Sequence, residues 1–202
     1  MNRYASIDRN LLDDLASKYT VEEIKLLFYC ISTLQMQRLL VMESELVIDY
    51  LSLRRYVFNK NLTNAEIILK FQALELDYLA FDDHYVYLEL ADDYITVDNY
   101  IQVYLLEIKP MHKYELMVYL KYLQFRDLGW VDNTIEYIRK YFNVPDTTQN
   151  KHLLEKIRKA IKRLDIPIDV EFERYNRKVT KIKMRFPKST HPMLKKENTQ
   201  SP

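Results

Sequence analysis

Residues 169–186, DVEFERYNRKVTKIKMRF, contain two runs in which charged and apolar residues alternate. The first run has acidic residues at 169, 171 and 173, and the second has basic residues at 181, 183 and 185. A period of two is typical of a β-strand with one buried face. The pattern therefore predicts an antiparallel hairpin whose opposite charges pair across the strands, with a tip (174–178) that contains basic residues and no acid.

The charge of the chain changes sign near its middle. Residues 1–108 contain 9 Lys and Arg against 18 Asp and Glu, whereas residues 109–202 contain 21 against 11. The net charges of the two parts are therefore −9 and +10, although the whole chain carries only +1. Such asymmetry indicates two modules with different partners, and the alternative is a chance distribution over a solvated surface.

The clearest interruption of the sequence pattern is Lys109-Pro110, where the charge also changes sign. We therefore predict an acidic domain at 1–110 and a basic domain at 111–186. Residues 187–202 are polar and without periodicity, which predicts a disordered tail.

The C-terminal half shows the element order of a winged helix. The predicted elements are a helix (113–125), a short strand (130–131), a helix (133–142) capped by Asp132, a third helix (from about 148 or 150 to 164) and the hairpin. In winged-helix proteins the third helix enters the DNA major groove, and the hairpin, called the wing, contacts the backbone or the minor groove.

The N-terminal half repeats this plan less clearly. Capping boxes at Thr20-x-x-Glu23 and Thr63-x-x-Glu66 each predict the start of a helix. The predicted elements are a helix to about 36, a strand (45–49), a short helix (50–57), a helix to about 79 and strands at 84–90 and 99–106. The expected fold class is α+β, with tandem winged-helix domains that are rich in helix and have small β-hairpin wings.

Four C-terminal segments carry a resemblance to a known family: KYELMVYLKYLQFRDLGW (113–130), NTIEYIRKYFNVPD (133–146), KHLLEKIRKAIKRLDIPIDVEFE (151–173) and RKVTKIKMRF (177–186). They resemble the plasmid replication-initiator family, which is built from two winged-helix domains. The N-terminal half resembles that family through EEIKLLFYCIS (22–32) and its element order. The resemblance implies a second domain that binds direct repeats at a replication origin and a first domain that mediates dimerisation. In that family the first domain also contributes DNA contacts, and the acidic first half of this chain departs from the family in this respect.

The third helix is expected to have one apolar face and one basic face, at about 100° per residue. Glu155 lies on the basic face, and we expect it to pair with Lys151, Lys159 or Arg158 rather than to accept a hydrogen bond from cytosine. The alternative for the whole face is an ordinary solvated helix surface. The candidate DNA contacts on the third helix and the wing tip are Lys151, His152, Lys156, Arg158, Lys159, Lys162, Arg163, Arg174, Arg177 and Lys178.

Composition disfavours several other functions. Gly129 is the only glycine, so the chain cannot form a glycine-rich phosphate loop. The four histidines have no ligand spacing, and Asp82-Asp83-His84 is typical of a polar hairpin turn. A strand-nicking tyrosine nucleophile needs a metal-binding histidine cluster or positioned arginines nearby, and the sequence around the 17 tyrosines indicates neither. We therefore expect no enzymatic activity, no metal and no cofactor.

Targeting and membrane signals are missing from the sequence. No apolar run reaches about 18 residues, and the N-terminus has no apolar signal segment. Cys30, the only cysteine, lies in an apolar helical pattern, which indicates a buried thiol in a reducing cytoplasm.

The leading hypothesis is a cytoplasmic initiator of plasmid replication that binds double-stranded DNA at direct repeats of an origin. Its acidic first domain is expected to form a homodimer or to bind a replisome protein. The alternatives are a winged-helix transcriptional regulator, and an adaptor whose basic face binds an acidic protein rather than DNA.

Overall fold

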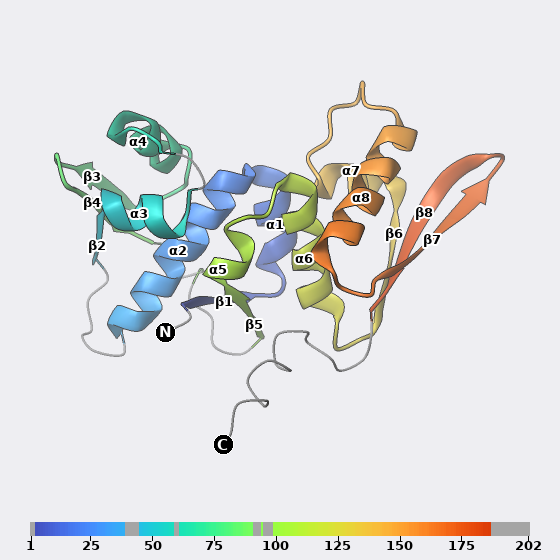
Figure 1. The fold of residues 1–202 in the computed structure, drawn as a ribbon, viewed down its shortest axis with the longest axis horizontal. Helices are drawn as coiled ribbons and strands as arrows, with labels where there is room; N and C mark the ends of the chain where they lie inside the picture. Colours follow the sequence, from blue (N-terminus) through green and yellow to red (C-terminus); the bar gives the residue numbers. More distant parts are fainter. Residues whose placement is uncertain (1–2, 39–44, 59–60, 91–93, 95–98, 187–202) are drawn as a thin grey trace, which may run out of the picture. The chain divides into compact units, whose positions relative to one another are not determined.

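The computed structural model describes residues 3–38, 45–58, 61–90, 94 and 99–186. The chain divides into two compact units, Met1–Lys113 and Tyr114–Pro202 (Figure 1). The division lies close to the predicted boundary after residue 110. The predicted tail at 187–202 lies outside the described residues.

The first unit combines helices with two small antiparallel sheets. Its described elements are β1 (Tyr4–Asp8), α1 (Leu11–Lys18), α2 (Val21–Arg38), β2 (Glu45–Asp49), α3 (Tyr50–Tyr56), α4 (Asn64–Gln72), β3 (Tyr78–Phe81), β4 (Tyr85–Glu89), β5 (Tyr100–Tyr104) and α5 (Leu105–Ile108). One sheet has the order β2-β4-β3, and β1 pairs separately with β5. Helix α2 is buried through Leu27, Phe28 and Ile31, which form the centre of the apolar core.

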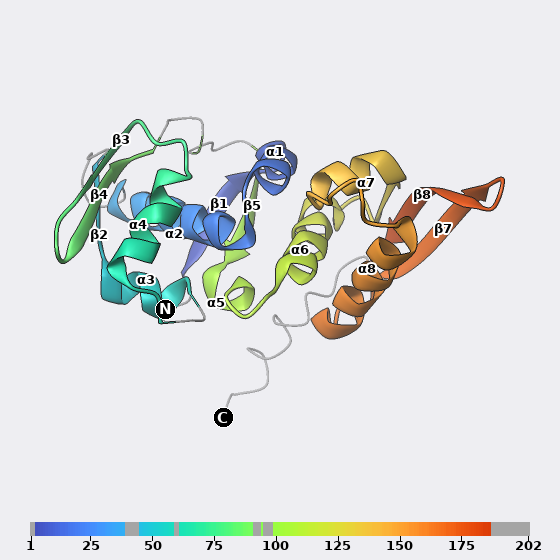
Figure 2. The same cartoon turned by 90° about the horizontal axis from the view of Figure 1, so that it is seen from above.

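The described part of the second unit, up to residue 186, contains three helices and one three-stranded sheet. Its elements are α6 (Lys113–Phe125), β6 (Trp130–Thr134), α7 (Ile135–Tyr141), α8 (Asn150–Leu164), β7 (Asp169–Tyr175) and β8 (Lys178–Arg185). The sheet order is β6-β8-β7, and α8 lies beside the hairpin β7–β8 in both views (Figures 1 and 2). Leu120, Ile138, Ile157 and Ile182, one from each of α6, α7, α8 and β8, are fully buried.

Both units contain the same succession of elements. A helix, strand, helix, helix and hairpin follow one another as α2-β2-α3-α4-β3-β4 and as α6-β6-α7-α8-β7-β8. In each three-stranded sheet the last strand pairs with both the first and the second, so the last strand lies at the centre. The mixture of helices with small antiparallel sheets confirms the predicted α+β class.

Some predicted elements are wrong in their bounds or caps, and two elements were not predicted. Helix α4 ends at Gln72 rather than near residue 79, because 78–81 form β3 and pair with β4. Strand β5 pairs with β1, which has no counterpart among the predicted elements, and neither has α1. Thr134 rather than Asp132 caps α7, because Asp132 lies within β6 opposite Lys183.

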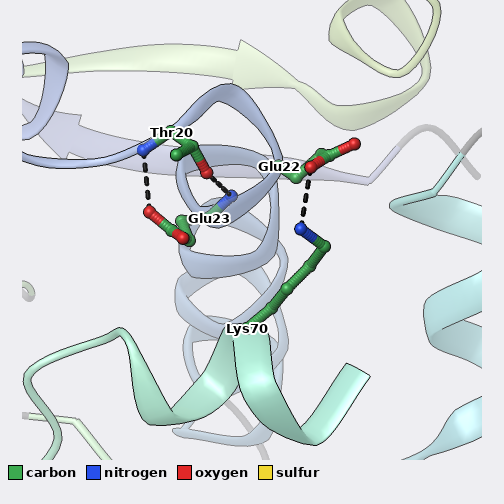
Figure 3. Close-up of polar contacts among 4 residues, drawn as sticks. All are labelled: Thr20, Glu22, Glu23 and Lys70. Carbon is green, nitrogen blue, oxygen red and sulfur yellow. Dashed lines mark hydrogen bonds and ion pairs between the residues drawn. The ribbon is translucent and has the colours of Figure 1, made fainter. Parts of the chain in front are cut away.

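Both predicted capping boxes are confirmed. The Thr20 N–H donates to Glu23 Oε2 at 2.7 Å, and the Glu23 N–H donates to Thr20 Oγ1 at 3.4 Å (Figure 3). Thr63 and Glu66 make the same reciprocal contacts at the start of α4. Next to the first box, Lys70 of α4 donates to Glu22 of α2 at 2.8 Å, which joins the two helices.

Backbone with positive φ ends several elements of the chain. Gly129 (φ 80°) follows α6, and its carbonyl accepts the Phe186 N–H at 2.8 Å, which ties the end of α6 to the end of β8. The other described residues with positive φ are Asn143, Asp165, Asn176 and Arg177.

Cys30 is fully buried, as predicted, and burial raises the pKa of its thiol.

Replacing Thr20 with alanine removes the hydroxyl that accepts the Glu23 N–H. We expect the free energy of unfolding of the first unit to fall by about 1 kcal/mol, measured by urea denaturation followed by circular dichroism. Thr147→Ala, at an exposed loop threonine of the second unit, should change the free energy of unfolding of that unit by less than about 0.5 kcal/mol. Equal effects of the two substitutions would show that the box adds no stability.

Candidate nucleic-acid interface

Helix α8 separates apolar from basic residues on opposite faces. Leu153, Leu154, Ile157 and Ala160 are buried against the unit, which sets the orientation of the helix. The helix ends at Asp165, whose φ of 52° turns the chain toward the hairpin. All ten predicted contact residues on α8 and the wing tip are solvent-exposed.

The body of the hairpin has the predicted register. Asp169 lies opposite Arg185, Glu171 opposite Lys183, and Glu173 opposite Lys181. Arg185 donates to Glu171 at 2.9 Å, and Lys181 lies 3.9 Å from Glu173 and 3.7 Å from Asp132. Glu171, Glu173, Lys181 and Arg185 therefore have ion-pair partners within the sheet, and Lys183 lies over the Trp130 ring at 5.3 Å.

The tip of the hairpin has a different character from its body. Asn176 (φ 48°) and Arg177 (φ 65°) form a two-residue turn with both φ angles positive, the geometry of a type I′ turn. An irregularity in the ladder between Glu173 and Arg174 separates this tip from the regular body. Tyr175, 72% exposed, extends into solvent at the same place.

Most of the predicted cations make no polar contact with protein. Within the described part of the chain, no hydrogen bond or ion pair involves the side chains of six of them: Lys151, Lys159, Lys162, Arg174, Arg177 and Lys178. Solvated cations without carboxylate partners attract phosphate, because no intramolecular ion pair has to break first.

The other predicted cations contact groups that the sequence pattern did not indicate. Arg158 lies over the Phe172 ring at 4.5 Å, and Lys156 lies over the Tyr114 ring at 5.2 Å. Arg163 forms an ion pair with Glu115 at 3.0 Å. Arg163 therefore has a structural partner as well as an exposed position.

The predicted partner of Glu155 is wrong. Glu155 Oε2 lies 3.7 Å from His152 Nδ1, rather than pairing with a lysine or arginine of the helix. This geometry leaves Lys151 and Lys159 without the carboxylate that helical spacing had assigned to them.

Two hollows flank α8. One, of about 440 Å³, lies between α8 and the wing, and its lining includes Lys151, Leu154, Arg158, Phe172, Arg174, Arg177 and Lys178. The other, of about 490 Å³, lies at the start of the helix and is lined by Thr147, Thr148, Gln149, His152, Glu155, Lys156 and Lys159. Basic side chains therefore line both hollows, and Glu155 borders each of them.

Helix α4 of the first unit provides an internal comparison. Helices α4 and α8 both begin with asparagine, Asn64 and Asn150. Counted from these residues, α4 has Ala65, Gln72 and Ala73 where α8 has Lys151, Arg158 and Lys159. At these three positions the second unit is basic and the first is neutral, whereas Lys70 of α4 corresponds to Lys156 of α8.

The hairpin turns of the two units also differ in charge. The turn of the first unit contains Asp82 and Asp83, whereas that of the second contains Arg177. Tyr87 donates a hydrogen bond to Asp82 at 2.7 Å and lowers the pKa of that carboxyl, so the turn is anionic at neutral pH. The first unit therefore offers no comparable surface for phosphate at this place.

No protein-family model matches this chain, and no curated protein matches it. Within the described ranges, no three histidine, cysteine, aspartate or glutamate side chains group as a metal site. None of the described helices combines the length and the apolar character needed to span a bilayer.

Removing Arg163 should affect stability. Arg163→Ala deletes an ion pair with Glu115, whose side chain is only 12% exposed, so we expect a loss of about 1 kcal/mol in the free energy of unfolding of the second unit. Lys162→Ala, which removes an adjacent unpaired cation, should change it by less than about 0.5 kcal/mol. Urea denaturation of both variants measures the two losses in stability. A loss for Arg163→Ala no larger than that for Lys162→Ala would contradict a stabilising role of the Arg163–Glu115 ion pair.

Proposed function

We propose that this protein is a sequence-specific double-stranded DNA-binding protein that initiates replication of a plasmid or similar mobile element. The two units would act as tandem winged-helix domains, with α8 in the major groove and the tip of β7–β8 on the backbone or in the minor groove. The shared element order and sheet topology of the units support this assignment.

The observation that carries the proposal is the set of six cations without a polar partner in the described chain: Lys151, Lys159, Lys162, Arg174, Arg177 and Lys178. They occur on the two elements that a winged helix presents to DNA, while the body of the hairpin neutralises its own charges. Phosphate contacts of this kind supply affinity and register, and base contacts from the same helix supply specificity.

The two hollows beside α8 also suit duplex DNA. A helix in the major groove, which is about 12 Å wide, has a phosphate backbone on each side. Lys151, Arg174 and Lys178 line the hollow on the wing side, and Lys156 and Lys159 line the other. Each backbone strand would therefore meet cations.

Initiation of replication is proposed because of the resemblance of residues 113–186 to plasmid replication initiators, and direct repeats of an origin are the expected target. The acidic first unit would form the homodimer or bind a replisome protein. A transcriptional regulator with the same DNA-binding surface is the second candidate, and an adaptor for an acidic protein is the third.

Fluorescence anisotropy with a labelled duplex over a salt series tests DNA binding. For the wild type we expect log K to fall with log[salt] by about 0.9 per phosphate neutralised. Lys159→Ala/Lys162→Ala should flatten this slope by nearly two units, because it removes two phosphate contacts.

Lys181→Ala/Lys183→Ala is the matched control, since it removes the same charge from the outer face of the sheet. It should leave the slope close to that of the wild type. Equal flattening by both double variants would indicate attraction by net charge alone. No binding by the wild type at low salt would refute both DNA-binding candidates and leave the adaptor.

Arg177→Gly separates the backbone of the wing tip from its charge. Glycine suits a φ of 65°, so the stability of the second unit should stay the same or rise by up to about 1 kcal/mol. The affinity of Arg177→Gly for duplex DNA should nevertheless fall, and its slope of log K against log[salt] should be flatter by nearly one unit. Arg177→Lys should retain most of the affinity and of the slope. Anisotropy together with thermal unfolding measures this, and wild-type affinity in Arg177→Gly would exclude the tip from the interface.

A further inference from the structure

One arginine holds the turn between α7 and α8. Arg139 Nη1 donates to the carbonyl of Thr148 at 2.7 Å and to Asn150 Oδ1 at 2.9 Å, and Nη2 donates to the carbonyl of Pro145 at 2.8 Å. The side chain of Arg139 is only 18% exposed. A planar guanidinium with several fixed acceptors restrains the turn and the first residue of α8 together.

The first unit contains the same arrangement. Arg54 donates through Nε to the carbonyl of Leu62 at 2.7 Å and through Nη2 to Asn64 Oδ1. Arg54 is the fifth residue of α3, and Arg139 is the fifth residue of α7. Asn64 and Asn150 are the first residues of the helices that follow, α4 and α8. We call each arginine with its asparagine and turn carbonyls an Arg–Asn clamp. The clamp belongs to the scaffold that both units share.

In the second unit the clamp borders the candidate interface. The clamped turn supplies Thr147, Thr148 and Gln149 to the hollow of about 490 Å³, and α8 supplies the basic side chains opposite them. A change in the turn would move the first residues of α8 and this wall of the hollow at the same time.

We propose that the clamp of Arg139 and Asn150 positions the start of α8 for sequence discrimination, and that Arg139 itself touches no DNA. This inference rests on the proposed function. Three of the five N–H donors of Arg139 meet protein acceptors, and Nη2 also lies 4.0 Å from Asp146 Oδ1, so we expect Arg139 not to add to the number of phosphates neutralised. Base contacts require positions accurate to about 0.5 Å, whereas phosphate contacts tolerate larger shifts. Loosening the clamp should therefore reduce discrimination more than overall affinity.

The test compares two duplexes bound by the full-length chain, one that the wild type selects from a random-sequence pool and one with the same bases shuffled. In Arg139→Ala the ratio of the two affinities should fall by about tenfold or more, while the salt slope on the shuffled duplex stays within about 0.3 of the wild type. Arg139→Lys should lose the same discrimination, because an ammonium cannot replace the planar fork.

Arg54→Ala is the matched control, since it breaks the equivalent clamp in the unit without the basic face. It should lower the melting temperature by a similar amount and leave the ratio within about twofold of the wild type. If Arg139→Ala does not fold, as judged by circular dichroism, Asn150→Ala takes its place, because it removes one acceptor only.

Three results would overturn the proposal. The first is an unchanged ratio in folded Arg139→Ala or Asn150→Ala, and the second is an equal loss of the ratio in Arg54→Ala. The third is a slope flatter by nearly one unit in Arg139→Ala, which would make Arg139 a phosphate contact. Failure of the wild type to bind any duplex would instead refute the proposed function, so the two failures are distinguishable.

Discussion

The second unit depends on β8 more than on any other element. This strand pairs with β6 on one side and β7 on the other, and it contributes the fully buried Ile182 and Met184 to the core. Strand β6 leads directly into α7, and β7 follows α8, so pairing with β8 fixes both the helix pair and the wing. The place of each basic side chain on α8 relative to the wing tip thus follows from pairing between residues about 50 apart in the chain.

Elements with strong local signals could be predicted from the sequence. The bounds of α6 agree with its apolar spacing, and the register of the hairpin agrees with its alternating charges. Local signals failed where a distant partner decides the structure. The segment 78–81 continues the helical pattern of α4 but becomes a strand because β4 lies beside it, and β1 exists only because β5 pairs with it. Tertiary pairing here overrides local propensity.

The candidate site shows the same limit. Helical periodicity gave the exposed face of α8, because that face depends only on the buried stripe of the helix. The partners of Arg158, Arg163 and Lys156 are Phe172 of β7 and Glu115 and Tyr114 of α6, and no spacing within α8 could indicate them. The Arg–Asn clamps were equally hidden, since the two arginines and two asparagines lie in segments with little other likeness.

The scarcity of glycine affects the unfolded chain as well as the folded one. Four of the five described residues with positive φ are asparagine, aspartate or arginine, and Gly129 is the fifth. Each of these side chains disfavours the left-handed backbone slightly in the native state, by about 1 kcal/mol for arginine. The same side chains also narrow the range of backbone conformations that the unfolded ensemble can visit. Folding therefore loses less backbone entropy than it would in a chain with glycine at every turn, which partly offsets the strain at those turns.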